Sequence, residues 1–142
     1  MQRGYTMLEL AVVAGVVGVV MSITLPHFGY LLDRIAVERA ATELTTALAV
    51  TRNRAVLRST RARLVLSGDS LRIDEWADQG WQPALRWLGP DQHQVNINTS
   101  NATVTFDAHG IGLGVANTRV ELWRGSQSAT ITMSRVGRVK RW

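Results

Sequence analysis

A single carboxylate, Glu9, lies at the start of an otherwise uncharged apolar segment, residues 7–25, MLELAVVAGVVGVVMSITL. The segment has about the 20 residues that a helix needs to cross a bilayer. An acidic side chain within such a helix is costly, so we expect it to have a partner. The simpler alternative places Glu9 among lipid headgroups with no particular partner.

The spacing around Glu9 suggests a partner. If the chain were cut after Gly4, Tyr5 would carry a new amino group. That group would lie four residues before Glu9, one helical turn away on the same face. Because a carboxylate and an ammonium attract strongly in a low dielectric, the two would pair within one chain or between neighbouring chains of a filament.

The second group of residues that could do chemistry is basic and lies at the C-terminal end. Residues 1–118 carry ten basic and ten acidic side chains, so the net charge of +5 comes from residues 119–142. There Glu121 is the only acid, and the bases are Arg119, Arg124, Arg135, Arg138, Lys140 and Arg141. This asymmetry predicts an anionic partner, nucleic acid or acidic lipid, whose phosphates these six basic side chains would contact. A solvated run of charge is the alternative.

The end of this run has the alternation of a strand. Arg138 and Lys140 would project to one face and Val139 to the other. Trp142 would either stack on a nucleic-acid base or pack on the domain, and the sequence leaves both open. A second basic group spans the end of the expected helix, where the helix dipole favours cations, and the first strand candidate. It comprises Arg52, Arg54, Arg58, Arg61 and Arg63.

Other chemistries lack their motifs. The chain has no cysteine, and its three histidines show no ligand spacing. The acids Asp69, Asp74, Glu75 and Asp78 do not fit an EF-hand loop, so we interpret them as a solvated acidic face. Neither a nucleophile elbow nor a Gly-rich phosphate loop occurs. We therefore predict no enzyme activity, no cofactor and no metal site.

Beyond the apolar segment, residues 33–58 have the period of a helix with one buried face. The apolar positions recur at intervals of three, four and seven residues; they are Val37, Ala41, Leu44, Leu48 and Ala55. We expect this helix to run on from the apolar segment, with a kink or local melting at Pro26.

After Ser59 the pattern changes to short strands. Strand candidates are residues 61–66, 71–76, 83–88, 95–98, 102–106, 119–125 and 128–135, the first two and the last two as hairpins. Residues 108–114 are Gly-rich and predict a loop or an irregular edge. Trp76, Trp81, Trp87 and Trp123 are expected in the core or half-buried. The predicted class is α+β, one long N-terminal helix packed on an antiparallel sheet.

Residues 4–9, GYTMLE, followed by the apolar run, resemble the class III signal of type IV pilins and pseudopilins. The resemblance implies cleavage after Gly4 by a prepilin peptidase, methylation of Tyr5, and contact of Glu9 with the amino group of a neighbouring subunit. Tyr5 stands where phenylalanine is usual. The implied organisation is a leader at residues 1–4, a transmembrane and assembly helix at 5–28, and a periplasmic pilin domain at 29–142.

The charge pattern predicts the orientation. Arg3 precedes the apolar segment, so the positive-inside rule places the N-terminus in the cytoplasm. We expect a single-pass protein of the inner membrane that enters a pilus on assembly, with other pilin subunits as its partners.

Within the pilins, residues 41–66 and the closing GRVKRW resemble the GspH/FimT group. FimT-like minor pilins carry a basic Gly-Arg-x-Arg tail that binds DNA during uptake. Gly137 and Arg138 match this tail, and Lys140 stands at the second arginine, where it keeps the charge but loses the bidentate fork. Arg141 is expected to compensate.

The resemblance thus implies a minor pilin that binds DNA non-specifically in natural transformation. The alternative is a structural minor pseudopilin of a type II secretion system, or a pilus assembly primer, without DNA contact.

Overall fold

The computed structural model describes residues 5–114 and 117–142, without the side chains of residues 25–27. The expected processing position Gly4 therefore lies outside the described residues. The chain divides into two compact units, Met1–Leu32 and Asp33–Trp142. Helix α1, Met7–Leu57, contributes its first part to one unit and its second part to the other.

The first unit is an apolar helical segment. Its described side chains are all exposed, and the mean hydropathy of its most apolar stretch is 2.3, so its length and composition would suit a membrane span. The helical assignment continues through Pro26, so the local melting expected there is not observed. Proline removes one amide donor, and the flanking helical bonds are enough to keep this segment helical.

The described residues of the second unit form, besides part of α1, two antiparallel sheets and one short 3-10 helix, η1, Pro90–His93. One sheet has the strand order β3-β2-β1-β5-β6 and the other β4-β7-β8-β9. The first sheet comprises β1 Ala62–Leu66, β2 Ser70–Ala77, β3 Gly80–Leu88, β5 Thr103–Phe106 and β6 Gly112–Leu113. The second comprises β4 Asn96–Thr99, β7 Thr118–Arg124, β8 Gln127–Met133 and β9 Val139–Arg141.

The α+β class is confirmed, and so are the β1–β2 and β7–β8 hairpins, but the single predicted sheet is two sheets. The reason lies between β3 and β4. Pro90 begins η1, which carries the chain away from β3 so that β4 pairs with β7. The Gly-rich residues 108–114 include the two-residue edge strand β6, in agreement with the expected irregular edge.

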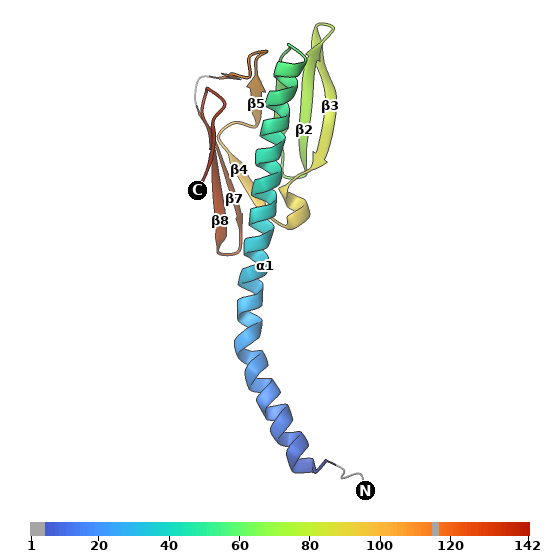
Figure 1. Ribbon diagram of the computed structural model, residues 1–142, viewed down its shortest axis with the longest axis vertical. Helices are drawn as coiled ribbons and strands as arrows, with labels where there is room; N and C mark the ends of the chain where they lie inside the picture. Colours follow the sequence, from blue (N-terminus) through green and yellow to red (C-terminus); the bar gives the residue numbers. More distant parts are fainter. Residues whose placement is uncertain (1–4, 115–116) are drawn as a thin grey trace. The chain divides into compact units, whose positions relative to one another are not determined.

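The core forms around the second half of α1. All five positions of the predicted apolar stripe are buried, and none is more than 3% exposed. They share one buried cluster with residues from the five-stranded sheet, such as Leu64 and Phe106, and from the four-stranded sheet, such as Leu122 and Ile131. Figure 1 shows strands of the two sheets on either side of this part of α1. The helix is therefore the common core element of both sheets.

Two expectations about polar and aromatic side chains were wrong in part. Asp74 is 2% exposed and forms ion pairs with Arg63 at 2.8 Å and Arg72 at 2.9 Å, so it does not belong to a solvated acidic face. A buried carboxylate needs such partners. Trp81 and Trp87 are half-buried as expected, whereas Trp76 and Trp123 are each 39% exposed.

Candidate nucleic-acid interface and assembly segment

The four-stranded sheet has one face on the core and one face toward solvent. Along β7 and β8, buried side chains such as Val120, Leu122 and Ile131 alternate with exposed or half-exposed ones, as the pleat requires. We call the solvent side the outer face. It is formed by Arg119, Glu121, Trp123, Ser128, Thr130, Thr132, Arg138, Lys140 and Trp142.

Three predicted DNA-contacting cations lie together on the outer face. In the strand register Arg119 lies opposite Thr132, and Thr132 lies opposite Lys140. Arg119 and Lys140 are therefore in one row across the sheet, on either side of Thr132. Strand spacing puts Arg119 and Lys140 about 10 Å apart, and Arg138 lies about 7 Å along the chain from Lys140. Arg119 binds Glu121 at 2.8 Å but stays 63% exposed. Within the described part of the chain, no acid pairs with Arg138 or Lys140.

Arg124 and Arg141 lie on the other side of the same strands, toward α1. Arg124 forms an ion pair with Asp33 at 2.9 Å and donates to the His93 carbonyl at 2.7 Å. Arg141 forms an ion pair with Glu38. Both arginines are thus directed toward acids of the helix, and a phosphate would have to compete with Asp33 and Glu38 for them. Arg141 could therefore compensate for Lys140 only by giving up its ion pair with Glu38.

Trp142 follows β9 and is held by its backbone. Its N–H donates to the Thr130 carbonyl at 2.9 Å, and the Thr130 N–H donates to its carbonyl at 3.1 Å. The side chain is 74% exposed, so of the two alternatives, packing on the domain is not what the structure shows. The Lys140 ammonium lies 5.5 Å from the centre of the indole ring, which is within the range of a cation–π contact.

The turn before β9 explains why residue 137 is glycine. Its φ is +76°, and a Cβ there would lie 3.0 Å from the Gly110 carbonyl oxygen and 3.2 Å from Arg52 Nε. The Gly137 N–H donates to the Ser134 carbonyl at 2.9 Å, and Arg52 Nε donates to the Gly110 carbonyl at 3.0 Å. Gly137 thus lets residues 134–138, which we call the basic turn, lie directly against the 107–110 turn and the end of α1.

Arg52 was missed by the sequence reasoning, which assigned it to the helix dipole. Its sequence position gives no signal for a contact 58 residues away with Gly110. Arg54 and Arg63 of the same basic group pair with Glu75 and Asp74. Arg58 and Arg61 are exposed, and within the residues that the structure covers no ion pair involves them.

Asp107 stabilises the turn that Gly137 packs against. Its carboxylate accepts the Ile111 N–H at 2.8 Å and the His109 N–H at 2.9 Å. These backbone donors, Ile111 first, lower the pKa of Asp107, and partial burial opposes them. The Gly112 N–H donates to the Arg135 carbonyl at 2.8 Å, which ties the same loop to the basic turn.

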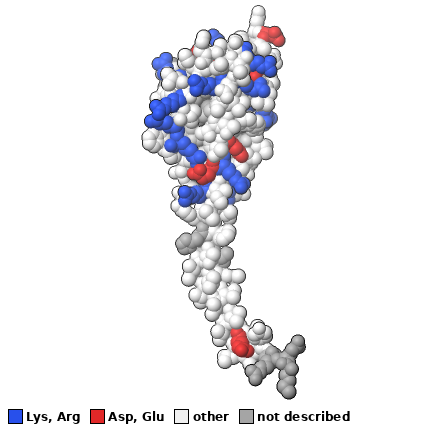
Figure 2. All heavy atoms as spheres, viewed as in Figure 1, with Lys and Arg blue, Asp and Glu red and all other residues white. Residues whose placement is uncertain are grey.

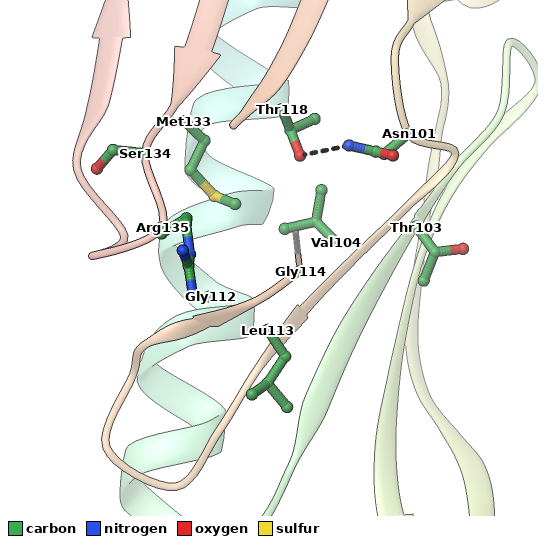
Figure 3. Close-up of a pocket in the computed structure, with 10 residues that line it drawn as sticks. All are labelled: Asn101, Thr103, Val104, Gly112, Leu113, Gly114, Thr118, Met133, Ser134 and Arg135. Carbon is green, nitrogen blue, oxygen red and sulfur yellow. Dashed lines mark hydrogen bonds between the residues drawn. The ribbon is translucent and has the colours of Figure 1, made fainter. Parts of the chain in front are cut away.

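Arg135 is exposed at a small pocket between the two sheets. The pocket has a volume of about 230 Å³ and is lined on one side by β5 residues Thr103 and Val104 and on the other by Met133, Ser134 and Arg135. Figure 3 shows these residues around the opening, with the hydrogen bond between Asn101 and Thr118 beside it. Arg135 therefore belongs to the basic turn and not to the pleated outer face.

The space-filling view shows how charge is distributed on one side of the molecule. Figure 2 shows many basic and few acidic side chains on the second unit, whereas the segment near the N-terminus is almost uncharged. The basic residues include 15 arginines, which bind phosphate through several donors each. The side of the second unit seen in this view is therefore predominantly basic.

At the other end of the chain, Glu9 has a partner that the sequence reasoning missed. The Glu9 carboxylate accepts the Thr6 N–H at 2.8 Å and the Thr6 hydroxyl at 3.0 Å, and the Glu9 N–H donates to the Thr6 hydroxyl at 3.2 Å. This is a capping box at the start of α1, and its signature is legible in the residues Thr6-Met7-Leu8-Glu9. Any intermolecular partner of Glu9 would have to compete with Thr6.

Comparison with known proteins identifies the family. The sequence profile of the family described as type II transport protein GspH matches residues 40–137, more than half of the chain. The chain belongs to the GspH family. This family comprises minor type IV pilins and pseudopilins, which are structural components of filaments, so the expected resemblance is confirmed.

Similar individual proteins agree with this family. The pilin-like protein PilA1 of Thermus thermophilus is 25% identical, and the alignment covers 98% of this chain and 97% of that protein. The minor pilin FimU of Pseudomonas aeruginosa has a TM-score of 0.65 at 19% identity, over 75% of this chain and 88% of FimU. The minor pseudopilin EpsH of Vibrio cholerae has a TM-score of 0.61 at 10% identity, over 75% of this chain and 95% of EpsH. The two structures show the pilin fold.

The close contact at Gly137 leads to a prediction about stability. Gly137→Ala should destabilise the fold by about 1–2 kcal/mol, because it places a Cβ in the left-handed region and against the Gly110 carbonyl. Gly80→Ala is the matched control, since a Cβ there meets nothing within 4 Å. Urea unfolding of the full chain in detergent micelles measures both. Equal midpoints for the two variants would contradict the role assigned to Gly137.

Proposed function

We propose that this GspH-family protein is a minor type IV pilin that binds DNA non-specifically during natural transformation. The observation that supports this best is the arrangement of the cations on the four-stranded sheet. Arg119, Arg138 and Lys140 share the outer face, and neither Arg138 nor Lys140 has an acidic partner among the described residues. Arg135 adds a fourth exposed cation in the adjoining turn.

The placement of these cations favours contact with a phosphate backbone. They project from regular strands and a constrained turn, so their spacing is set by the sheet and not by long flexible loops. Arg138, directly before β9, and Lys140, within it, lie two residues apart in an extended segment, about 7 Å along the chain. Contacts of this kind would carry no base specificity and would weaken strongly with salt.

The alternative is a structural role without DNA contact. It is favoured by the family's description as a type II transport protein and by the fold shared with the pseudopilin EpsH. The exposed cations would then contact other subunits of a pseudopilus. A measurement of DNA binding separates the two functions, since only the first requires the outer face to bind DNA.

The DNA-binding proposal predicts the effect of removing two outer-face cations. Arg138→Ala/Lys140→Ala should weaken binding to duplex DNA and lower the salt slope of log K by about 1.8, because each phosphate contact contributes about 0.9. Fluorescence anisotropy with the full chain in non-ionic detergent, over a series of salt concentrations, measures both quantities.

The matched control removes two cations from elsewhere. Arg58→Ala/Arg61→Ala changes the net charge equally, and both residues are exposed near the end of α1 and the start of β1. This control should keep most of the slope. An equal loss in the two double variants would show that only net charge matters, and absence of DNA binding by the unchanged chain would favour the structural role.

We further propose that the N-terminal residues follow the pilin maturation route. A prepilin peptidase would remove residues 1–4 and expose Tyr5, whose amino group would be methylated. Residues 5–28 would then anchor the chain in the inner membrane with the N-terminus in the cytoplasm and residues 29–142 in the periplasm. On assembly into a pilus, Glu9 would exchange Thr6 for the amino group of a neighbouring subunit.

Maturation is tested by the mass of the chain after co-expression with a prepilin peptidase. The unchanged chain should begin at Tyr5, and Gly4→Val should remain uncut because a branched side chain replaces the glycine at the cleavage position. Gly29→Val, farther along the helix, should be cut normally. An unchanged chain that keeps its first four residues, or a Gly4→Val chain that begins at Tyr5, would contradict the proposed cleavage.

A further inference from the structure

The outer face of the four-stranded sheet carries aromatic side chains beside its cations. Trp142 is 74% exposed and Trp123 is 39% exposed, although a tryptophan usually buries most of its large apolar ring. Trp142 follows Arg138 and Lys140 at intervals of two residues, so the three side chains project from the same side of the extended segment. β9 and the residues at its ends therefore present two cations and one indole in succession toward solvent. Along the chain, Arg138, Lys140 and Trp142 are spaced about 7 Å from one to the next.

The backbone that carries the exposed indole is held by hydrogen bonds and by inner side chains. Both backbone groups of Trp142 bond to Thr130, and on the inner side of the strand Arg141 pairs with Glu38 of α1. Val139, between the two cations, packs against the buried core. The inner side chains therefore anchor β9, and the outer ones project from an anchored backbone toward solvent.

We infer that this face binds single-stranded nucleic acid, with an unpaired base stacked on Trp142 and the adjoining phosphates bound by Lys140 and Arg138. The inference rests on the proposed DNA-binding function and specifies the form of the ligand. Aromatic side chains stack on bases of single strands, whereas in a duplex the base faces are covered by their neighbours. An open four-stranded antiparallel sheet with exposed aromatic residues is a known platform for such stacking.

The charges around the indole are compatible with this ligand. The Lys140 ammonium lies over one face of the ring at 5.5 Å, and a base stacked on that face would displace it toward the adjoining phosphate. Arg119 lies in the same row as Lys140, on the far side of Thr132. Among the described side chains of this face, Glu121 is the acidic one, and its carboxylate forms an ion pair with Arg119 at 2.8 Å. Trp123 offers a second, less exposed ring on β7, about 12 Å from Trp142 by strand spacing.

The experiment compares single-stranded and duplex DNA of the same length. The probes are an oligodeoxythymidylate of about 16 nucleotides and the corresponding duplex, titrated against the full chain in detergent micelles at one salt concentration. The unchanged chain should prefer the single strand. Trp142→Ala should lose about tenfold in affinity for the single strand, within the range measured for one stacked base, and keep its duplex affinity.

Tryptophan fluorescence gives a second readout that detects the stacking itself. The single strand should quench the emission of the unchanged chain and of Trp76→Phe, a control on the other sheet. Trp142→Phe should retain most of the affinity, because a ring is still present, but lose most of the quenching.

The outcomes distinguish this inference from the function on which it rests. Equal affinity for the two probes, or an equal loss for both in Trp142→Ala, would overturn the stacking inference and leave duplex binding by the cations in place. Absence of binding to either probe would overturn both.

Discussion

The apolar stripe of α1 from Val37 to Ala55 is the surface on which both sheets pack. Among the described residues the two sheets share no strand pair, so burial against the helix joins them. Alanines at positions such as 40, 41 and 47 are at most 1% exposed, and their small side chains let strands approach the helix closely. This packing determines which side chains of a strand point toward α1, because alternate side chains project to opposite sides of a sheet and one side lies on the helix.

Polar residues of the same helix then determine which cations remain available. Asp33 holds Arg124 of β7, Glu38 holds Arg141 of β9, and Glu43 contacts His93 of η1 at 3.0 Å. Pairs of this kind, partly open to solvent, contribute about 0–1 kcal/mol each, so their main effect is to orient the segments that they join. Because these acids face inward-pointing arginines, the outer face of the four-stranded sheet keeps Arg138 and Lys140 unneutralised.

Most of the architecture was predictable from local patterns. The helical period of residues 33–58, the two hairpins and the apolar run all have strong signals in the sequence. The division into two sheets was not predictable, because it depends on where η1 directs the chain after Leu88. The capping box of Thr6 and Glu9 is predictable from the spacing of these two residues in the sequence. The contact of Arg52 is not, because its partner lies 58 residues away.

The candidate site was predictable only as a set of charges. The basic run identified six cations. Their division between the two faces depends on which residues of each strand point toward the core, and on the acids of α1 that lie opposite the inward-pointing arginines. Arg119 and Lys140 are 21 positions apart, yet the register brings them into one row. The exposure of Trp142 likewise depends on which side of β9 meets the core.

The most direct test compares Lys140 and Arg141, two adjacent residues of β9 that carry the same charge and whose side chains project to opposite sides of the sheet. The salt dependence of DNA binding would be measured for Lys140→Ala and for Arg141→Ala, with the full chain in detergent. The account predicts that Lys140→Ala lowers the slope of log K by about 0.9 and that Arg141→Ala leaves the slope unchanged. An equal loss of slope in both variants, or a loss confined to Arg141→Ala, would contradict the assignment of the outer face as the DNA-binding surface.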